Sequence, residues 1–235
     1  MDRVGLATLF PIDDLVLPSL WEAVAGTPEI TWSSRDEEDR FLDFSPEFGR
    51  VWRWKDELPK RRLVCVGKHV RGRSALVSLR VLPALYAARR EQDELSPLER
   101  EVVDFLTEHG PCSTADLPDL IGHERKPVAR AVDRLQRRLM LTTAGAQERA
   151  QGWPAVIADL LARRYREQLR RLPDPEVARS ELAEVVLASV REISAADLAA
   201  AIGSTRKQAA AALDLLVDGG RVRRRDQEGF GLYAR

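Results

Sequence analysis

Apolar residues recur at helical spacing in two separate stretches of the chain. In each stretch they fall three or four positions apart: Val128, Ala131, Val132, Leu135 and Leu139 in the first, and Ala209, Ala212, Leu213 and Leu216 in the second. This spacing places them on one side of an α-helix, with polar residues on the other side. The pattern predicts two amphipathic helices, each with one buried stripe and one exposed face.

The sequences in front of these helices are also alike. "STADLPDLIG" (113–122) corresponds to "SAADLAAAIG" (194–203), and "IGHERKPVARAVDRL", which begins at Ile121, aligns without gaps with "IGSTRKQAAAALDLL", which begins at Ile202. An internal repeat indicates one supersecondary unit used twice. Each copy predicts a short helix, a tight turn at a glycine and a longer helix, which together make a helix-turn-helix.

A further helix is predicted before each copy. In "SPLEREVVDFLTEHG" (96–110), Ser96 and Glu99 have the spacing of a capping box, Pro97 suits the first helical position, and Gly110 ends the helix. "SELAEVVLASVRE" (180–192) predicts the corresponding helix of the second copy.

Alternation of apolar and polar residues follows the second copy. "RVRRRDQEGFGLYAR" (221–235) alternates around Val222, Phe230 and Leu232, with "DQEG" as a turn, and predicts a β-hairpin. The first copy has a shorter counterpart in "LMLTTAG" (139–145), whose second strand is harder to assign. A helix-turn-helix with an appended hairpin is a winged helix. We therefore expect a mainly α fold with small β-hairpins (α+β), in which tandem winged helix-turn-helix domains span residues 95–150 and 176–235.

The remaining segments flank these two domains. "WPAVIADLLARRYREQLRRL" (153–172) predicts an amphipathic linking helix within residues 151–175, broken by "PDP". Residues 1–94 predict helices in "SLWEAVAG" and "SPEFGRVWRWKDELP", strands in "RLVCVGKHV" and "SALVSL", and a helix in "RVLPALYAARR". Two helices followed by a hairpin leave open whether this region is a degenerate winged helix. Trp52 and Trp54 are expected to be core or interface aromatics.

Composition excludes several other classes of protein. The 235 residues are 44% hydrophobic and 31% charged, and 37 basic residues balance 37 acidic ones, so no overall field attracts nucleic acid. No apolar run reaches the roughly 20 residues of a bilayer span, and acidic residues stand near the start, so we expect a cytoplasmic protein without membrane contact. Cys65 and Cys112 are expected to be reduced thiols. His109 and Cys112 together are too few ligands for zinc, so we expect neither a metal nor a cofactor.

Positive charge is concentrated where a winged helix faces DNA. Such a domain lays its third helix in the major groove and its hairpin along the backbone, so both surfaces need cationic side chains. The first copy carries these charges on the helix, whereas Ala211 and Leu215 of the second copy replace Arg130 and Arg134. We expect these residues to contact double-stranded DNA: Arg125, Lys126, Arg130, Arg134 and Arg137 in the first copy; Arg206, Lys207, Arg221, Arg223, Arg224 and Arg225 in the second; and Lys68, Arg71 and Arg73 in the N-terminal region.

This arrangement, together with "WRWKDELP" (52–59) and "GKHVRGRSALVSLRVLPALYA" (67–87), resembles the bacterial AlkZ/YcaQ winged-helix family and particularly its AlkZ-related members. The resemblance implies tandem winged helices that clamp duplex DNA and a link to DNA repair. The glycosylase members excise bulky alkylated bases or unhook crosslinks without a cofactor, and a Gln-x-Gln or Gln-x-Asp motif positions the attacking water. None of the seven glutamines of this chain stands in such a motif. The resemblance therefore implies DNA binding without an intact glycosylase motif.

Three functions stay open, and the first is the leading hypothesis. It is a DNA-binding protein that is noncatalytic or weakly catalytic. The second is a DNA glycosylase with an altered active site, for which the acids Asp56 and Glu57, flanked by basic residues in "WKDELP", would hold the attacking water. The third is an adaptor whose winged helices bind another protein or a second copy of the chain.

Overall fold

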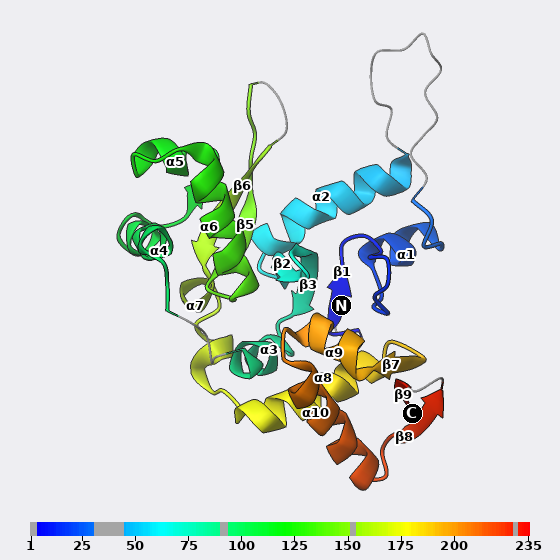
Figure 1. The fold of residues 1–235 in the computed structure, drawn as a ribbon. Helices are drawn as coiled ribbons and strands as arrows, with labels where there is room; N and C mark the ends of the chain where they lie inside the picture. The colour runs from blue at the N-terminus through cyan, green and yellow to red at the C-terminus, as the bar shows by residue number, and fades with distance from the viewer. Residues whose placement is uncertain (1–3, 31–44, 90–93, 151–153, 228–229) are drawn as a thin grey trace.

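The computed structural model describes residues 4–30, 45–89, 94–150, 154–227 and 230–235 (Figure 1). Its elements fall into three parts that follow one another along the chain. The first part contains strand β1 (Leu6–Thr8), helices α1 (Leu20–Ala25) and α2 (Pro46–Lys60), strands β2 (Val64–Val70) and β3 (Arg73–Ser78), and helix α3 (Leu82–Ala88).

The second part comprises α4 (Pro97–His109), β4 (Cys112–Ser113), α5 (Leu117–Leu120), α6 (Arg125–Arg137), β5 (Leu141–Gln147) and β6 (Ala155–Leu160). A short helix α7 (Leu161–Arg164) and a 3-10 turn η1 (Gln168–Arg170) connect it to the third part. The third part comprises α8 (Pro175–Leu187), β7 (Glu192–Ser194), α9 (Ala195–Ile202), α10 (Arg206–Asp218), β8 (Arg223–Gln227) and β9 (Phe230–Ala234).

Each part contains one three-stranded antiparallel sheet, and the strand order follows the same plan in all three. The orders are β1-β3-β2, β4-β6-β5 and β7-β9-β8, so the first strand always pairs with the last strand of the part. Two helices separate the first strand from the other two strands, and α4 or α8 precedes the first strand in the second and third parts. The order of elements that the second and third parts share therefore recurs in the first, without a preceding helix among the described residues.

Side-chain caps fix the starts of the repeated helices. At α4 the Glu99 amide donates to Ser96 Oγ at 3.3 Å, and the Ser96 amide donates to Glu99 Oε2 at 2.9 Å. This is the predicted capping box. Thr205 and Gln208 make the same reciprocal pair at α10. Because caps satisfy amides that the helix itself leaves unpaired, these residues set where each helix begins.

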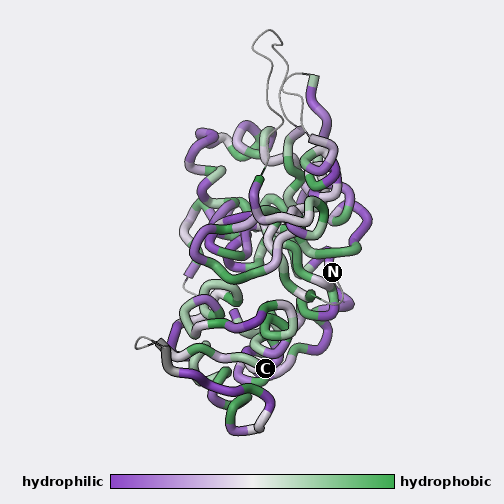
Figure 2. Tube along the Cα trace, turned by 90° about the vertical axis from the view of Figure 1, so that its right-hand side faces the viewer, coloured by the Kyte–Doolittle hydropathy of each residue, from purple (hydrophilic) through white to green (hydrophobic). Residues whose placement is uncertain are grey.

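The β2–β3 hairpin lies between other elements on both of its faces. Val66 and Leu76 belong to a cluster with α1 and α2, whereas Cys65 and Val77 belong to a cluster with α3 and the third part. Successive residues of a strand point to opposite faces, so both faces of this sheet are buried, which explains the unbroken apolar run "LVCV". The first and third parts thus share one hydrophobic core. The second part keeps its own core, and Figure 2 shows the hydrophobic segments running through the interior of the trace.

Polar contacts join β2 to the second part. His69 is 3% exposed and its Nδ1 donates to the backbone oxygen of Gln136 at 3.1 Å, while the Thr142 hydroxyl donates to Val66 O at 2.9 Å. Burial lowers the pKa of His69 to about 3 and raises the pKa of Cys65 to about 12. Both groups are neutral at physiological pH, so Cys65 is an unreactive thiol here.

A buried arginine connects helix ends of the second and third parts. Arg89, which is 6% exposed, donates from Nε to Ile202 O at 2.6 Å and from Nη2 to Ala201 O at 3.2 Å, at the end of α9. Its Nη1 donates to Arg137 O at 3.1 Å, at the end of α6. The last carbonyls of a helix lack helical partners and attract cations. Burial lowers the pKa of Arg89 to about 10, which leaves it charged at neutral pH.

The predicted linking helix over residues 151–175 is wrong in its first half. Residues Ala155–Leu160 form β6, which pairs with both β4 and β5, and within the described residues 154–174 only Leu161–Arg164 and Gln168–Arg170 are helical. An apolar run this short fits a strand and a helix equally well, so the neighbouring strands decide the outcome. β6 also supplies the second strand of the hairpin that begins in "LMLTTAG".

The elements predicted within residues 1–94 are confirmed in order. Gly26 ends α1 in the left-handed conformation, Ser45 Oγ accepts from the Phe48 amide at the start of α2, and Arg71 and Gly72, both with positive φ, make the turn between β2 and β3. Helix α2 continues through Pro59 to Lys60. In the described part of the chain, no helix is long and apolar enough to cross a membrane.

Candidate nucleic-acid interface

Helix α6 presents one cationic face. Its buried residues Val128, Val132 and Leu135 pack in the core of the second part with α4, β5 and β6. The opposite side of the helix exposes the five basic residues expected from the sequence: Arg125, Lys126, Arg130, Arg134 and Arg137. Lys126 and Arg130 make no ion pair or hydrogen bond with any residue that the structure describes, so their charges are available to a ligand.

Arg134 has a structural partner as well as an exposed position. Its Nε donates to Glu99 Oε1 at 2.6 Å, and the Glu99 side chain is only 4% exposed. Burial opposes ionisation of Glu99, but hydrogen bonds from Arg134 and Ser96 outweigh it and hold the pKa of this carboxyl below its ordinary value. Replacing Arg134 would leave a buried carboxylate with one fewer donor. Arg134 therefore supports the fold of the second part.

The β2–β3 hairpin lies against the same helix. Lys68 Nζ is 2.6 Å from a carboxylate oxygen of Asp133, and the Lys68 amide donates to Gln136 Oε1 at 3.0 Å. A Cβ placed on Gly72 would lie 3.0 Å from the Arg137 guanidinium, so this side chain rests on the turn. The structure thus brings two groups that the sequence predicts separately, residues 68–73 and α6, onto one continuous surface. Arg71 and Arg73 are exposed beside the turn.

The basic residues of the third part form a separate group. Arg206 and Arg224 line an open groove of about 650 Å³ between α10 and the β8–β9 hairpin, together with the acid Asp214. Arg224 also lies over the Tyr233 ring at 5.8 Å, and Arg221 pairs with Glu184 at 2.6 Å. Lys207, Arg223 and Arg225 are exposed.

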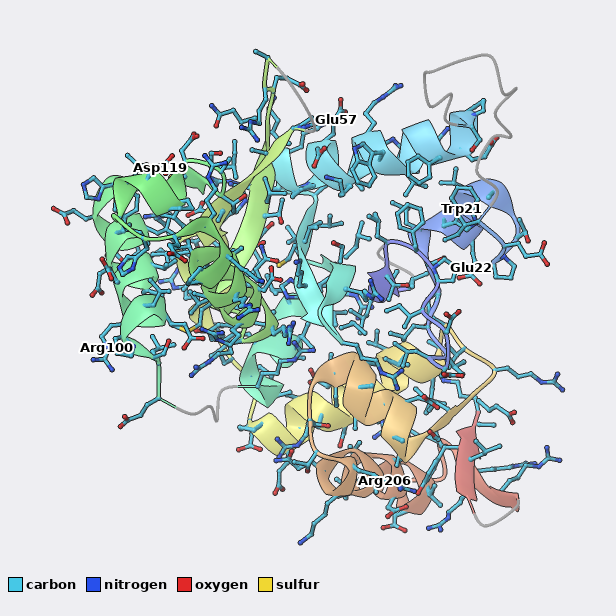
Figure 3. The ribbon with its side chains drawn as sticks, turned by 45° about the horizontal axis from the view of Figure 1, so that its top comes forward. Trp21, Glu22, Glu57, Arg100, Asp119 and Arg206 are labelled. Carbon is cyan, nitrogen blue, oxygen red and sulfur yellow. The ribbon has the colours of Figure 1, made fainter. Side chains whose placement is uncertain are left out.

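The third-part group and the α6 surface lie apart. Figure 3 shows Arg206 on α10 far from Asp119, which lies beside the start of α6 and is 3.7 Å from Arg125. Arg89 connects the end of α6 to the end of α9, the helix that precedes α10, through the carbonyl oxygens of Arg137 and Ile202. The structure therefore brings together the predicted residues of the first two parts, and leaves those of the third part on a surface of their own.

Helix α2 carries a cationic face that the sequence analysis missed. Arg50, Arg53, Glu57 and Lys60 are exposed along one side of it, and Trp54 among them is 38% exposed. Their spacing of three or four residues is the signal that could have found this face. Trp52 is as expected, because it stacks on Phe48 with ring centroids 5.7 Å apart, but Trp54 does not belong to the core.

Contacts with the second part hold the C-terminal end of α2. Arg164 donates through Nη2 to the backbone oxygens of Pro59, of Lys60 at 3.3 Å and of Ala144 at 3.3 Å. Gly145 of β5 lies next to α2, since a Cβ placed on it would be in van der Waals contact with the Lys60 side chain at 3.4 Å. Helix α2 therefore packs against strand β5 of the β5–β6 hairpin (Figure 1).

The two acids considered for catalysis lie on this same helix. Asp56 accepts from Lys55 Nζ at 2.5 Å, and Lys55 lies 4.7 Å above the Trp52 ring. Glu57 is exposed (Figure 3). Asp56 therefore serves an ion pair on the surface of α2, and its role in catalysis stays a prediction.

Metal ligands do not gather in the part of the chain that the structure describes. Groups of three or more His, Cys, Asp and Glu side chains with the geometry to hold an ion are absent from these residues. Cys65 and Cys112 are free thiols, and His109 Nδ1 donates to Phe105 O at 3.1 Å.

The chain was compared with known protein families and solved structures. The model of the AlkZ-related family matches residues 1–203. Among solved structures, the Streptomyces sahachiroi DNA glycosylase AlkZ is similar with a TM-score of 0.51 and 16% identity, over 76% of this chain and 54% of that chain. The chain thus spans about half the length of that structure, and the likeness concerns the fold.

A second match carries no argument, since its TM-score is 0.24. It is the DIP2311 protein from Corynebacterium diphtheriae, 21% identical over 68% of this chain and 31% of that one. No curated protein matches the sequence. On the family match, which covers most of its length, the chain belongs to the AlkZ-related family.

Proposed function

We propose that this protein binds double-stranded DNA through tandem winged helices, in a role linked to DNA repair. The order of elements supports the assignment, because helix, strand, helix, helix and two further strands, with the first strand paired to the last, is the plan of a winged helix-turn-helix. In the second part this domain begins at residue 95 and extends to residue 160, because β6 supplies its third strand. In the third part it covers residues 176–235.

The first part is the third member of this series. Its α2 stands where α6 and α10 stand in the other parts, directly before the last two strands of the sheet. In a winged helix this is the helix that enters the major groove. The cationic face of α2 is therefore assigned to DNA as well.

One observation carries the proposal. The exposed charges of α6 and the β2–β3 turn belong to one surface, fixed by the contact of Lys68 with Asp133 and of Arg137 with Gly72. A surface of arginine and lysine side chains held on rigid elements suits the phosphates of a duplex. The name of the similar structure, a DNA glycosylase, agrees with a DNA ligand. Such a protein works in the cytoplasm, on the nucleoid.

The test is duplex binding measured by fluorescence anisotropy over a series of salt concentrations. Replacing Lys126 and Arg130 together by alanine should weaken binding roughly tenfold. The slope of log affinity against log salt should fall by about 1 for each phosphate that the variant no longer touches. Arg134 is left in place because it pairs with Glu99.

The matched control is the double variant R100A/R191A, which removes two exposed charges elsewhere and should bind as the parent does. Duplex affinity that is the same for K126A/R130A and for the parent would contradict the role of α6. Failure of the parent to bind any duplex at low salt would favour a protein partner or a second copy of the chain.

Base excision is a second candidate because the similar structure is named a DNA glycosylase. Asp56 and Glu57 are the acids of α2 assigned to it, and both lie within a cationic face. Incubation with alkylated or crosslinked duplex, followed by detection of released base, distinguishes it from binding alone. If base is released, D56N and E57Q should identify the acid, and release by both variants at the parent rate would contradict this assignment.

A further inference from the structure

The basic segment 163–171 contains two pairs of arginines with different environments. Arg163 donates to Asp159 Oδ1 at 2.5 and 3.0 Å and to Leu106 O at 2.6 Å, and Arg164 binds the end of α2. Arg166 and Arg170 are exposed and, within the described residues, make neither an ion pair nor a hydrogen bond through their side chains. Arg163 and Arg164 therefore stabilise the fold, whereas Arg166 and Arg170 make no such contacts within the described residues.

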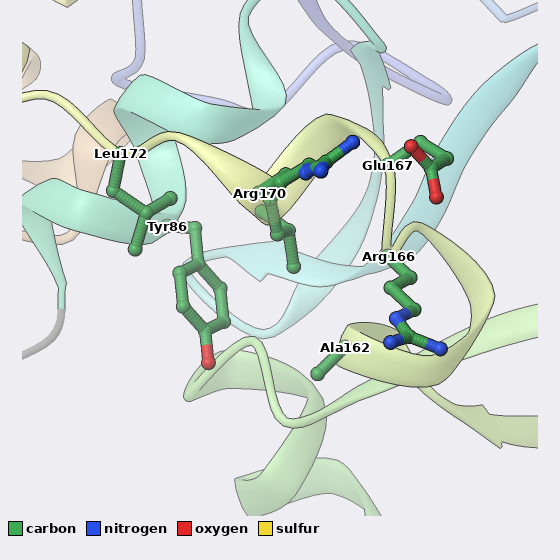
Figure 4. A pocket seen from close by; sticks show the side chains of 7 residues that line it. Tyr86, Ala162, Arg166, Glu167, Arg170 and Leu172 are labelled. Carbon is green, nitrogen blue, oxygen red and sulfur yellow. The ribbon is translucent and has the colours of Figure 1, made fainter.

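Arg166 and Arg170 line an open pocket of about 710 Å³, shown in Figure 4. The pocket lies where helix α3 meets the segment containing α7 and η1. Tyr86 of α3 lines it with its ring and hydroxyl, and Leu169 and Leu172 add apolar surface. A volume of this size accommodates a small organic ligand.

The walls of the pocket are anchored to the core. Tyr165, 1% exposed, donates its hydroxyl hydrogen to Val64 O at 2.8 Å, and the Leu169 amide donates to Tyr165 O at 3.1 Å. Leu169, Leu172 and Tyr86 pack against the shared core of the first and third parts. The site therefore exists before a ligand arrives, which reduces the entropy lost on binding.

The chemistry of the lining selects the ligand. Guanidinium groups bind phosphate oxygens through paired N–H donors, and a tyrosine ring with neighbouring leucines accepts a flat, largely apolar group. Glu167 on the same rim accepts hydrogen bonds from hydroxyl or amino groups but repels phosphate. A ligand with a phosphate at one end and a sugar and base at the other suits the two arginines, the apolar surface around Tyr86 and the acceptor Glu167.

We propose that this pocket is a nucleotide-binding site in which Arg166 and Arg170 hold the phosphate and Tyr86 packs against the base. The pocket shares no residue with the duplex-binding surface of α6 and β2–β3, so the proposal stands independently of duplex binding. The nucleotide is either free or the 5′-phosphorylated end of a nucleic acid strand, which present the same chemistry.

Calorimetric titration of the full chain tests the site. The probes are adenosine 5′-monophosphate, inorganic phosphate, and a short single strand with a 5′-phosphate. We expect saturable binding of the monophosphate, the strand or both, weakened about tenfold or more in R166A/R170A. The control R171A/R191A removes two exposed arginines that do not line the pocket and should bind as the parent does.

The variant Y86L keeps an apolar side chain in α3 but removes the aromatic ring. It tests the contribution of the base to binding separately from that of the phosphate. It should weaken binding of the monophosphate while leaving inorganic phosphate unaffected. The proposal is overturned if neither nucleotide probe binds the parent, if R166A/R170A binds as the parent does, or if inorganic phosphate binds as tightly as the monophosphate. Binding of the strand alone assigns the site to a nucleic acid end, and binding of the monophosphate assigns it to a free nucleotide.

Discussion

Helices α6 and α10 share a fold position and an exposed Arg-Lys pair in the first turn, but they differ in the residues exposed further along the helix. Both bury four or five residues at the same spacing, and both stand before two strands of a three-stranded sheet. Arg130 and Arg134 of α6 correspond to Ala211 and Leu215 of α10, and Leu215 is 54% exposed. Packing constrains the residues at core positions, whereas the residues at exposed positions can differ and serve different functions.

The difference continues beneath the surface. When the repeat alignment is extended into the preceding helix, Ser180 of α8 corresponds to Glu99 of α4. Glu99 receives hydrogen bonds from Arg134, but Ser180 Oγ is buried without a hydrogen-bond partner among the described residues. Where α10 lacks the arginine, α8 also lacks the acid. The ion pair between the exposed Arg134 and the buried Glu99 therefore distinguishes the second part from the third, and the third part has neither of its two residues.

The largest expected effect comes from removing Arg89, which connects the end of α6 to the end of α9, the helix directly before α10. Arg89→Met would leave the carbonyl oxygens of Ala201, Ile202 and Arg137 without their buried donor. Because hydrogen bonds to charged groups are among the strong ones, we expect the free energy of unfolding to fall by roughly 3 kcal/mol or more. Urea denaturation measures this, and R191A, an exposed change, is the control. A loss below about 0.5 kcal/mol would show that the hydrogen bonds from Arg89 contribute little to joining the ends of α6 and α9.

A smaller effect distinguishes the two buried helix positions. Glu99→Gln should lower the free energy of unfolding by about 1 to 3 kcal/mol at pH 7, because Arg134 loses a charged acceptor. Ser180→Ala should leave it unchanged or raise it slightly, since the hydroxyl has no partner within the described part of the chain. Urea denaturation of both variants checks the contrast, and equal losses would contradict it.

The difference in stability between the parent and E99Q should also depend on pH. The pKa of Glu99 is lowered in the folded protein, so its stabilising effect is present above the ordinary value of 4.5 and is lost as the pH falls below it. The difference in stability between the parent and E99Q should therefore narrow on acidification. A difference that stays constant down to about pH 3 would contradict the ion pair as its cause.

The smallest effect is a gain in binding. Placing arginines on α10 with A211R/L215R copies the face of α6, and should raise duplex affinity severalfold if the third part also faces DNA. Anisotropy with the duplex used for α6 measures it. A211Q/L215Q, which changes the same exposed positions without adding charge, should bind as the parent does. Equal affinity for both double variants would assign α10 to a surface away from DNA.

Local features of the fold are predictable from the sequence, and distant contacts are not. Ser96 and Glu99 indicate the start of α4, and the apolar spacing indicates α6, because each signal lies within a few residues. The run that forms β6 predicts a helix just as well, because the partners that make it a strand, β4 and β5, lie elsewhere in the chain.

The candidate site follows the same rule. The sequence shows the charges of α6 and of residues 68–73, but it does not show that the two groups lie on one surface. Lys68 and Asp133 are far apart in the chain, and no periodicity relates them. The exposed face of α2 does carry a readable signal in its spacing, but Trp52 and Trp54 on the same helix favour an interpretation as core.

The hydrogen bonds from Arg89 to α9 have a consequence for two glycines that the repeat aligns. Gly122 and Gly203 both have φ near +70°, but a Cβ on Gly122 would meet nothing within 4 Å among the described residues, whereas one on Gly203 would lie 2.4 Å from Arg89 Nε. Asparagine, which tolerates this backbone conformation, is thus admissible at 122 and excluded at 203. Among sequences that keep the arginine, position 203 should require glycine, whereas position 122, which has the same positive φ but no close neighbour, should accept asparagine as well as glycine.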